Sequence, residues 1–265
     1  MRDERFASLR QTERTWAVGA IHGEVARLKA LHGRLAERLR RGDNLVYMGN
    51  ILGRGGAVGE TVNEILAFRR AFLARPGVFA ADLAYLRGGQ EEMWHKLLQL
   101  QFAPNPGEVL RWMLDQGVGP TLQAYGGDAK KGLMATRAGA LAVTGWTNGL
   151  RAAMRTRDGH VALTSALRRA AFIADHSLLF VHAGIDPSRP LFQQADSFWW
   201  GGREFDRLAA PYGTFTRIVR GYDPAHRGVA IGPLTATLDG GCGFGGPLMA
   251  GCIHASGEVG ELIEA

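Results

Sequence analysis

The chain of 265 residues carries a formal net charge of +6, and 46% of its residues are apolar. This length and apolar content suffice for one substantial core in a single domain. No apolar run approaches the roughly 20 residues of a membrane-spanning helix, which argues against a membrane protein. Residues 1–15 are polar and lack the apolar segment of a signal peptide, so we expect a loose lead-in there and one domain over residues 16–265.

Most of the excess positive charge comes from arginines in helix-like stretches, such as Arg34, Arg38, Arg151 and Arg155. Such positions are typical of the solvated face of an amphipathic helix, and no aromatic-basic motif accompanies them. Nucleic-acid binding is therefore not favoured, whereas an acidic protein partner is compatible with the charge.

The chain has two cysteines, Cys242 and Cys252, which stand on segments that we predict to be closing strands. They lack the CxxC spacing of a metal or redox motif. Reduced thiols and a cytoplasmic location are therefore favoured.

Three short strand-like runs occupy residues 16–18, 45–48 and 83–86, and each ends in a glycine turn followed by a helical pattern. Behind the first turn, Leu28, Leu31 and Leu35 recur at the spacing of one buried helix face. This order predicts βαβ units. Because ligands bind at the carboxyl ends of such strands, we expect the three turns to converge on one site.

The three turns share a pattern with a known family. They read Gly19-Ala20-Ile21-His22-Gly23, Gly49-Asn50-Ile51-Leu52-Gly53-Arg54-Gly55 and Gly88-Gly89-Gln90-Glu91. In order and spacing they resemble the calcineurin-like metallophosphoesterases, above all the bacterial members of the protein serine/threonine phosphatase branch, which carry Gly-Asp-x-His-Gly, Gly-Asp-x-x-Asp-Arg-Gly and Gly-Asn-His-Glu. Segments 112–126, 180–184, 221–224 and 238–248 are also similar to family segments. The resemblance implies an α/β sandwich of two mixed β-sheets flanked by helices.

The resemblance also implies two divalent ions, such as Mn, Fe or Zn, held by six side chains. The corresponding positions here are Ala20, His22, Asn50, Gly89, His182 and Tyr222. Only the two histidines match the family. Alanine and glycine offer no donor atom, a neutral amide cannot share charge between two cations, and a phenol with a pKa near 10 is a poor ligand. We therefore expect neither a metal nor another cofactor.

The family's catalytic positions are also altered. Its proton-donating histidine corresponds to Gln90, whose amide cannot exchange a proton near pH 7, and the orienting aspartate corresponds to Gly53. No catalytic residue is expected at either position. The loss of three carboxylates together, at residues 20, 50 and 53, avoids the repulsion that acids without a metal would cause. The joint absence of these three carboxylates is typical of a pocket that is stable without a metal ion.

Neighbouring side chains are possible ligands of an atypical, rebuilt metal centre, namely Asp223, His226, Glu91, Asp186 and Asp239. However, Asp223 precedes a proline and is expected to cap its own turn. Glu91 stands where an acid favours a helix N-terminus. A rebuilt centre remains an alternative hypothesis.

One functional residue of the family persists. Arg54 matches the second-motif arginine, whose guanidinium fork would bind two phosphate oxygens. A cap on loop or helix carbonyls is its alternative role. Arg203 stands near a second phosphate-binding arginine of the bacterial members, in a displaced register, and the adjacent Trp199 and Trp200 are expected in the core.

These observations predict a catalytically inactive pseudophosphatase with a binding or regulatory role and a residual phosphate-binding pocket. Two alternatives stay open. One is an active phosphoesterase with an atypical metal centre, acting on phosphoprotein or on a dinucleoside polyphosphate. The other is an interaction scaffold whose old pocket binds nothing.

Overall fold

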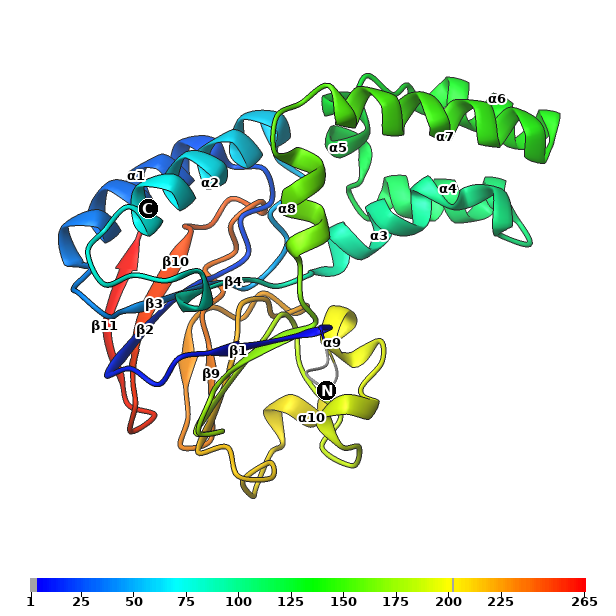
Figure 1. Ribbon diagram of the computed structural model, residues 1–265. Coiled ribbons are helices and arrows are strands. Elements are labelled where there is room, and N and C mark those ends of the chain that lie inside the picture. The colour runs from blue at the N-terminus through cyan, green and yellow to red at the C-terminus, as the bar shows by residue number, and fades with distance from the viewer. Residues whose placement is uncertain (1–3, 202) are drawn as a thin grey trace.

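The computed structural model describes residues 4–201 and 203–265, which form two packed β-sheets with helices outside them (Figure 1). The strand order is β11-β10-β2-β3-β4 in one sheet and β1-β5-β6-β7-β9-β8 in the other. Both sheets combine parallel and antiparallel pairs. The predicted α/β sandwich of two mixed sheets is confirmed.

The three predicted strands lie side by side in the five-stranded sheet, where β2 pairs in parallel with β3 and β3 with β4. The strands of this sheet are β2 (Arg14–Val18), β3 (Asn44–Tyr47), β4 (Leu83–Tyr85), β10 (Met249–His254) and β11 (Val259–Glu264). The second sheet consists of β1 (Phe6–Leu9), β5 (Ala170–Ile173), β6 (Leu178–Val181), β7 (Arg217–Arg220), β8 (Ala230–Ile231) and β9 (Thr235–Thr237).

Apolar side chains from both sheets fill the space between them, among them Val46 from β3, Phe180 from β6 and Val219 from β7. β3 and β6 are buried along their whole length, because each sheet is covered on both faces. Because these strands are buried, the polar groups of the site stand beyond the strand ends, in the turns and in the helix that begins at Gly89.

Helices cover the outer faces of the sheets (Figure 1). α1 (Val25–Arg38) and α2 (Val58–Leu73) lie against the five-stranded sheet, and the predicted stripe of Leu28, Leu31 and Leu35 is buried. The segment between β4 and β5 is largely helical, and its hairpins project beyond the sheets. Its helices are α3 (Gly89–Leu98), α4 (Pro106–Asp115), α5 (Gly119–Ala124), α6 (Ala129–Ala138), α7 (Ala140–Arg155) and α8 (His160–Ala166). None of the described helices is long and apolar enough to cross a membrane.

The remaining helical elements are short. α9 (Ser197–Trp200) and α10 (Arg203–Asp206) lie outside the six-stranded sheet, where Phe198 and Trp199 join its outer apolar cluster. Single 3-10 turns occupy Ala80–Asp82, Leu100–Phe102 and Leu191–Gln193. The expectation that Trp199 packs in the core is confirmed, and Trp200 is partly buried against the same cluster.

Two local expectations were wrong. Phe6–Leu9 is not part of a loose lead-in but forms β1, which pairs in parallel with β5 and buries Phe6 and Leu9. The second concerns Cys242, which lies in a turn between β9 and β10, whereas Cys252 lies in β10 as expected. The turn includes Gly241 and Gly243, both with φ of 83°, a left-handed conformation that a strand ladder does not allow.

Candidate functional site

The predicted glycine turns meet at the carboxyl ends of β2, β3 and β4. The Asn50 carbonyl oxygen accepts hydrogen bonds from the backbone N–H groups of Ile21 and His22, at 3.0 and 2.6 Å. The Gln90 N–H donates to Asn50 Oδ1 at 2.9 Å. From the second sheet, the ring of Tyr222 stacks on His182 with centroids 5.1 Å apart. The turns therefore converge on one cluster, as the sequence predicted.

The two histidines that match the family motifs, His22 and His182, are buried inside this cluster. His182 Nδ1 donates to the Met48 carbonyl oxygen at 2.7 Å, and His22 Nε2 lies 3.2 Å from Asn50 Nδ2. Burial lowers the pKa of His182 to about 4. Burial is the main cause that lowers the pKa of His22 to about 3, and the nearby guanidinium of Arg54 acts in the same direction. Both rings are therefore neutral at pH 7, and the other nitrogen of each has no hydrogen-bond partner among the described residues.

The position of the family's third-motif asparagine is closed by a tryptophan. A β-carbon on Gly89 would lie 2.9 Å from Trp200 Cζ3 and 3.3 Å from the Trp199 carbonyl oxygen. The Trp200 ring also makes an edge contact with Trp112 of α4, with centroids 5.8 Å apart. A ligand side chain at residue 89 would have to displace this indole.

The two catalytic positions of the family pack against each other. Gly53 has a φ of 116°, and a β-carbon there would lie 2.7 Å from Gln90 Cδ. Gln90 Nε2 donates to the Gln116 carbonyl oxygen at 2.8 Å. The amide side chain thus fills the space beside Gly53 and connects the turn to the helical segment. This geometry assigns Gln90 a packing contact and supplies no acid.

Glu91 joins the second and third turns. Its Oε2 accepts the N–H groups of Asn50 and Gly88 at 2.9 and 2.7 Å, and its Oε1 accepts the Leu52 N–H at 2.8 Å. The side chain is buried, which raises the pKa of the carboxyl, and these backbone hydrogen bonds oppose that rise. Glu91 therefore holds two turns in register, and its oxygens are committed to backbone donors.

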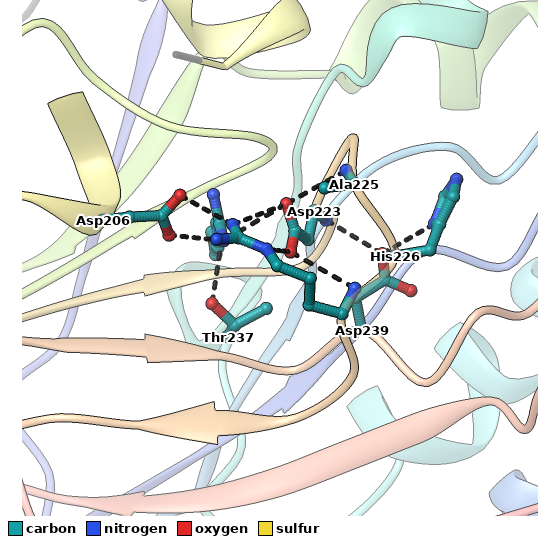
Figure 2. A network of polar contacts seen from close by, with 8 residues as sticks. Asp206, Asp223, Ala225, His226, Thr237 and Asp239 are labelled. Atoms are coloured by element: carbon teal, nitrogen blue, oxygen red, sulfur yellow. Dashed lines mark hydrogen bonds and ion pairs between the residues drawn. The ribbon is translucent and has the colours of Figure 1, made fainter. Parts of the chain in front are cut away.

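Asp239 and His226 belong to a second polar network (Figure 2). The His226 ring meets the Tyr222 ring edge to face, with centroids 5.3 Å apart. Asp239 Oδ2 accepts the Asp223 N–H at 2.8 Å and lies 3.3 Å from His226 Nδ1. Asp239 Oδ1 accepts the Gly241 N–H at 2.8 Å. This carboxylate stabilises the turns on either side of it.

Asp223 and Asp186 both cap turns. Asp223 Oδ1 accepts the Ala225 N–H at 3.1 Å, as expected for a residue before proline, and its Oδ2 accepts a hydrogen bond from Arg227 Nε at 2.7 Å. Asp186 Oδ1 accepts from the backbone and hydroxyl of Ser188 at 3.0 and 2.6 Å. Each carboxylate already has local partners.

Arg54 has no such partner. Its guanidinium carbon lies 4.4 Å from the centroid of the Phe244 ring, and a β-carbon on Gly117 would lie 2.7 Å from Arg54 Cγ. Among the described residues none accepts a hydrogen bond from Arg54, so it does not cap a carbonyl there. The structure places Arg203 at the start of α10, and its side chain lies outside the described part of the chain.

Sequence reasoning missed Phe244, which contacts both Arg54 and His22. The His22 and Phe244 rings meet edge to face with centroids 5.3 Å apart. Phe244 is 40% exposed between two glycines, Gly243 and Gly245. An aromatic residue isolated in a glycine turn is unusual for packing, and that feature was available in the sequence.

The cluster does not fit a pair of divalent ions. Asn50 Oδ1 already accepts the Gln90 N–H, Trp200 covers Gly89, and Ala20 supplies no donor. Within residues 4–201 and 203–265, no group of three or more histidine, cysteine, aspartate or glutamate side chains is arranged to hold a metal ion. Two histidine nitrogens are fewer ligands than protein metal centres use.

Comparisons agree with the architecture. No family model matches the sequence, and no curated protein matches it. A structure assigned as a diadenosine tetraphosphatase is 20% identical, with a TM-score of 0.55 over 98% of both chains. A protein serine/threonine phosphatase from Saccharomyces cerevisiae is 14% identical, with a TM-score of 0.53 over 98% of this chain and 82% of that chain. A cold-active protein tyrosine phosphatase is 14% identical, with a TM-score of 0.52 over 96% and 79%.

These neighbours are calcineurin-like metallophosphoesterases. The chain has their fold, with two mixed sheets flanked by helices. At identities of 20% and below, the likeness establishes the fold alone.

Proposed function

We propose that this protein is a pseudophosphatase, which binds a phosphorylated ligand through Arg54 and does not hydrolyse it. The observation that carries this proposal is the packing at the emptied positions. Trp200 lies against Gly89, and Gln90 lies against Gly53. Neighbouring side chains thus occupy the places where the family's ligand and acid would stand, which favours an altered role over a recent loss of single residues.

The guanidinium of Arg54, which has no hydrogen-bond partner among the described residues, supports the binding role. It is partly exposed and lies between Phe244 and Gly117, and α2 begins at Val58, a few residues further along. An arginine fork makes two charge-assisted hydrogen bonds to a phosphate, and a helix N-terminus favours the same anion. The net charge of +6 also favours an acidic partner or a phosphorylated ligand. A bacterial, cytoplasmic protein with reduced thiols and no metal cofactor is part of the same proposal.

Titration calorimetry with phosphate and a phosphopeptide tests the binding role. A charge-assisted bidentate contact contributes about 1.5–3 kcal/mol, so Arg54→Ala is expected to weaken binding about ten- to a hundredfold. Arg54→Lys keeps the charge but loses the forked guanidinium, so its affinity is expected to lie between those of wild type and Arg54→Ala. Arg155→Ala is the matched control, because Arg155 is an exposed arginine on the distant α7. Equal affinities for wild type and Arg54→Ala would contradict the proposal, and no binding by either would favour the scaffold.

An active phosphoesterase with a single metal ion is the second candidate, because His22 Nδ1 and His182 Nε2 both lack a partner among the described residues. Two measurements distinguish the two candidates. One is elemental analysis of protein purified without chelator, and the other is the turnover of aryl phosphates and dinucleoside polyphosphates in added manganese. We expect no stoichiometric metal, no change of melting temperature on chelation, and no turnover above that of a His22→Ala/His182→Ala variant. Activity that depends on the two histidines would refute the pseudophosphatase.

A further inference from the structure

A cavity of about 490 Å³ lies beside the emptied positions, between α10 and the turn that follows β7. Its volume is typical of small-molecule sites. Three arginines line it, Arg207, Arg220 and Arg227, together with the indole of Trp200. It is separate from Arg54, which does not line it.

Two of the three arginines are held in place by carboxylates (Figure 2). The Asp206 carboxylate lies between them, 2.9 Å from Arg220 Nη2 and 2.6 Å from Arg227 Nη2. Asp223 lies 3.4 Å from Arg220 Nη2 and 2.7 Å from Arg227 Nε. The two carboxylates therefore neutralise two of the guanidinium charges.

Arg220 is a rigid element of this wall. Its side chain is 2% exposed, its Nε donates to Thr237 Oγ1 at 2.9 Å, and its guanidinium carbon lies 4.4 Å from the centroid of the Phe205 ring. The Nη1 groups of Arg220 and Arg227 have no acceptor in the described part of the chain. Both arginines line the cavity, and the Arg227 side chain, which is 54% exposed, offers the more accessible of the two donors.

Arg207 is the uncompensated charge of the cavity. Its side chain is exposed and forms neither an ion pair nor a hydrogen bond with any residue that the structure describes. Among the lining residues that the structure describes, three guanidinium groups against two carboxylates leave one net positive charge. A monoanion would therefore balance the charges of this cavity.

The rest of the lining is apolar. Trp200 presents an indole, and Pro224 and Ala225 contribute aliphatic surface on the turn after Tyr222. Aromatic bodies stack on an indole and on aliphatic surface alike. The cavity therefore combines an anion-binding wall with an apolar wall.

We propose that this cavity is a second binding site, which takes an aromatic carboxylate: the planar carboxylate bonds to the spare N–H groups of the arginines, and the ring packs on Trp200. A carboxylate matches the fork of a guanidinium and carries the single charge that the lining lacks. The site goes beyond the proposed phosphate binding at Arg54 and does not depend on it.

Benzoate, acetate and neutral benzamide are the probes, titrated into the full-length protein while the indole N–H resonances are followed by NMR. We expect benzoate to shift the Trp200 resonance, identified by its absence in Trp200→Leu, and to bind about tenfold more tightly than acetate. Benzamide, which lacks the charge, is expected not to bind measurably.

Arg207→Ala is the decisive variant, because Arg207 has no partner within the described fold and its loss should leave the melting temperature unchanged. We expect it to weaken benzoate binding about tenfold, the effect of one charged hydrogen bond. Arg54→Ala and Arg155→Ala should bind benzoate like wild type. Unchanged affinity in Arg207→Ala, a loss of benzoate binding in Arg54→Ala, or no benzoate binding at all would each overturn this second site. None of these results would alter the phosphate titration that tests Arg54.

Discussion

Glu91 offers the sharpest test of how the candidate site is held together. Its carboxylate accepts the backbone N–H groups of Asn50, Leu52 and Gly88, which belong to two different turns. Replacing Glu91 with alanine leaves three buried donors without an acceptor. Replacing it with glutamine keeps the shape, but its NH2 group faces an N–H donor in place of one oxygen.

The expected loss of stability follows from these three bonds. A hydrogen bond to a charged group contributes about 1.5–3 kcal/mol, and bonds that share one acceptor are not additive. We therefore expect Glu91→Ala to lower the free energy of unfolding by about 3–5 kcal/mol, as when one partner of a buried charged network is removed. Glu91→Gln should lose about half as much, because two of the three bonds survive.

Urea denaturation followed by circular dichroism measures this difference through the midpoint and slope of each transition. Glu92→Gln is the control in the same helical turn, because the Glu92 carboxylate is also largely buried, at 7% exposed, but pairs only with the side chains of Arg87 and Lys96 among the described residues. This control removes a buried charge from the turn and leaves the three backbone donors of Glu91 paired, so we expect it to cost less than Glu91→Ala. If Glu91→Ala were no less stable than Glu92→Gln, the carboxylate would not hold the two turns together.

Two further predictions concern the same cluster. Gly89→Asn should lower the free energy of unfolding by about 1–3 kcal/mol, because the new side chain overpacks against Trp200, and it should not bring in a metal ion. Adding Trp200→Ala should recover part of that loss in urea denaturation. Full stability of the Gly89→Asn variant would contradict the close contact between residue 89 and Trp200. The free energy of unfolding should also fall as the pH drops from 7 to 5. Histidines in the unfolded chain take up protons near pH 6.5, whereas His182 and His22 in the folded protein have pKa values of about 4 and 3 and stay neutral. Each of the two therefore lowers the free energy of unfolding by about 2 kcal/mol at pH 5. A His22→Gln/His182→Gln variant should show a smaller loss over the same range, and an equal loss would mean that other groups cause it.

Local sequence patterns were enough to predict β2, β3, β4 and the first two helices. Each of these elements can be recognised from a short stretch of sequence, by an apolar run, a glycine turn or a helical stripe such as Leu28, Leu31 and Leu35. β1 escaped prediction because Phe6 and Leu9 are isolated among polar residues, and their burial depends on pairing with β5, far along the chain. Cys242 was misplaced because the glycines around it allow left-handed turns, which a count of apolar residues does not reveal.

The sequence by itself determined which side chains stand at the positions that match the family motifs, and therefore that the cluster where the three turns meet would have no carboxylate at residues 20, 50 and 53. Only the tertiary structure decided what fills it. The contact between Trp200 and Gly89, the three backbone bonds of Glu91, and the arginine-lined cavity beside Asp206 each join segments that are distant in the chain. Such contacts depend on how the two sheets and their helices pack. The distance between two turns is set by the whole fold, and the spacing of residues along the sequence does not determine it.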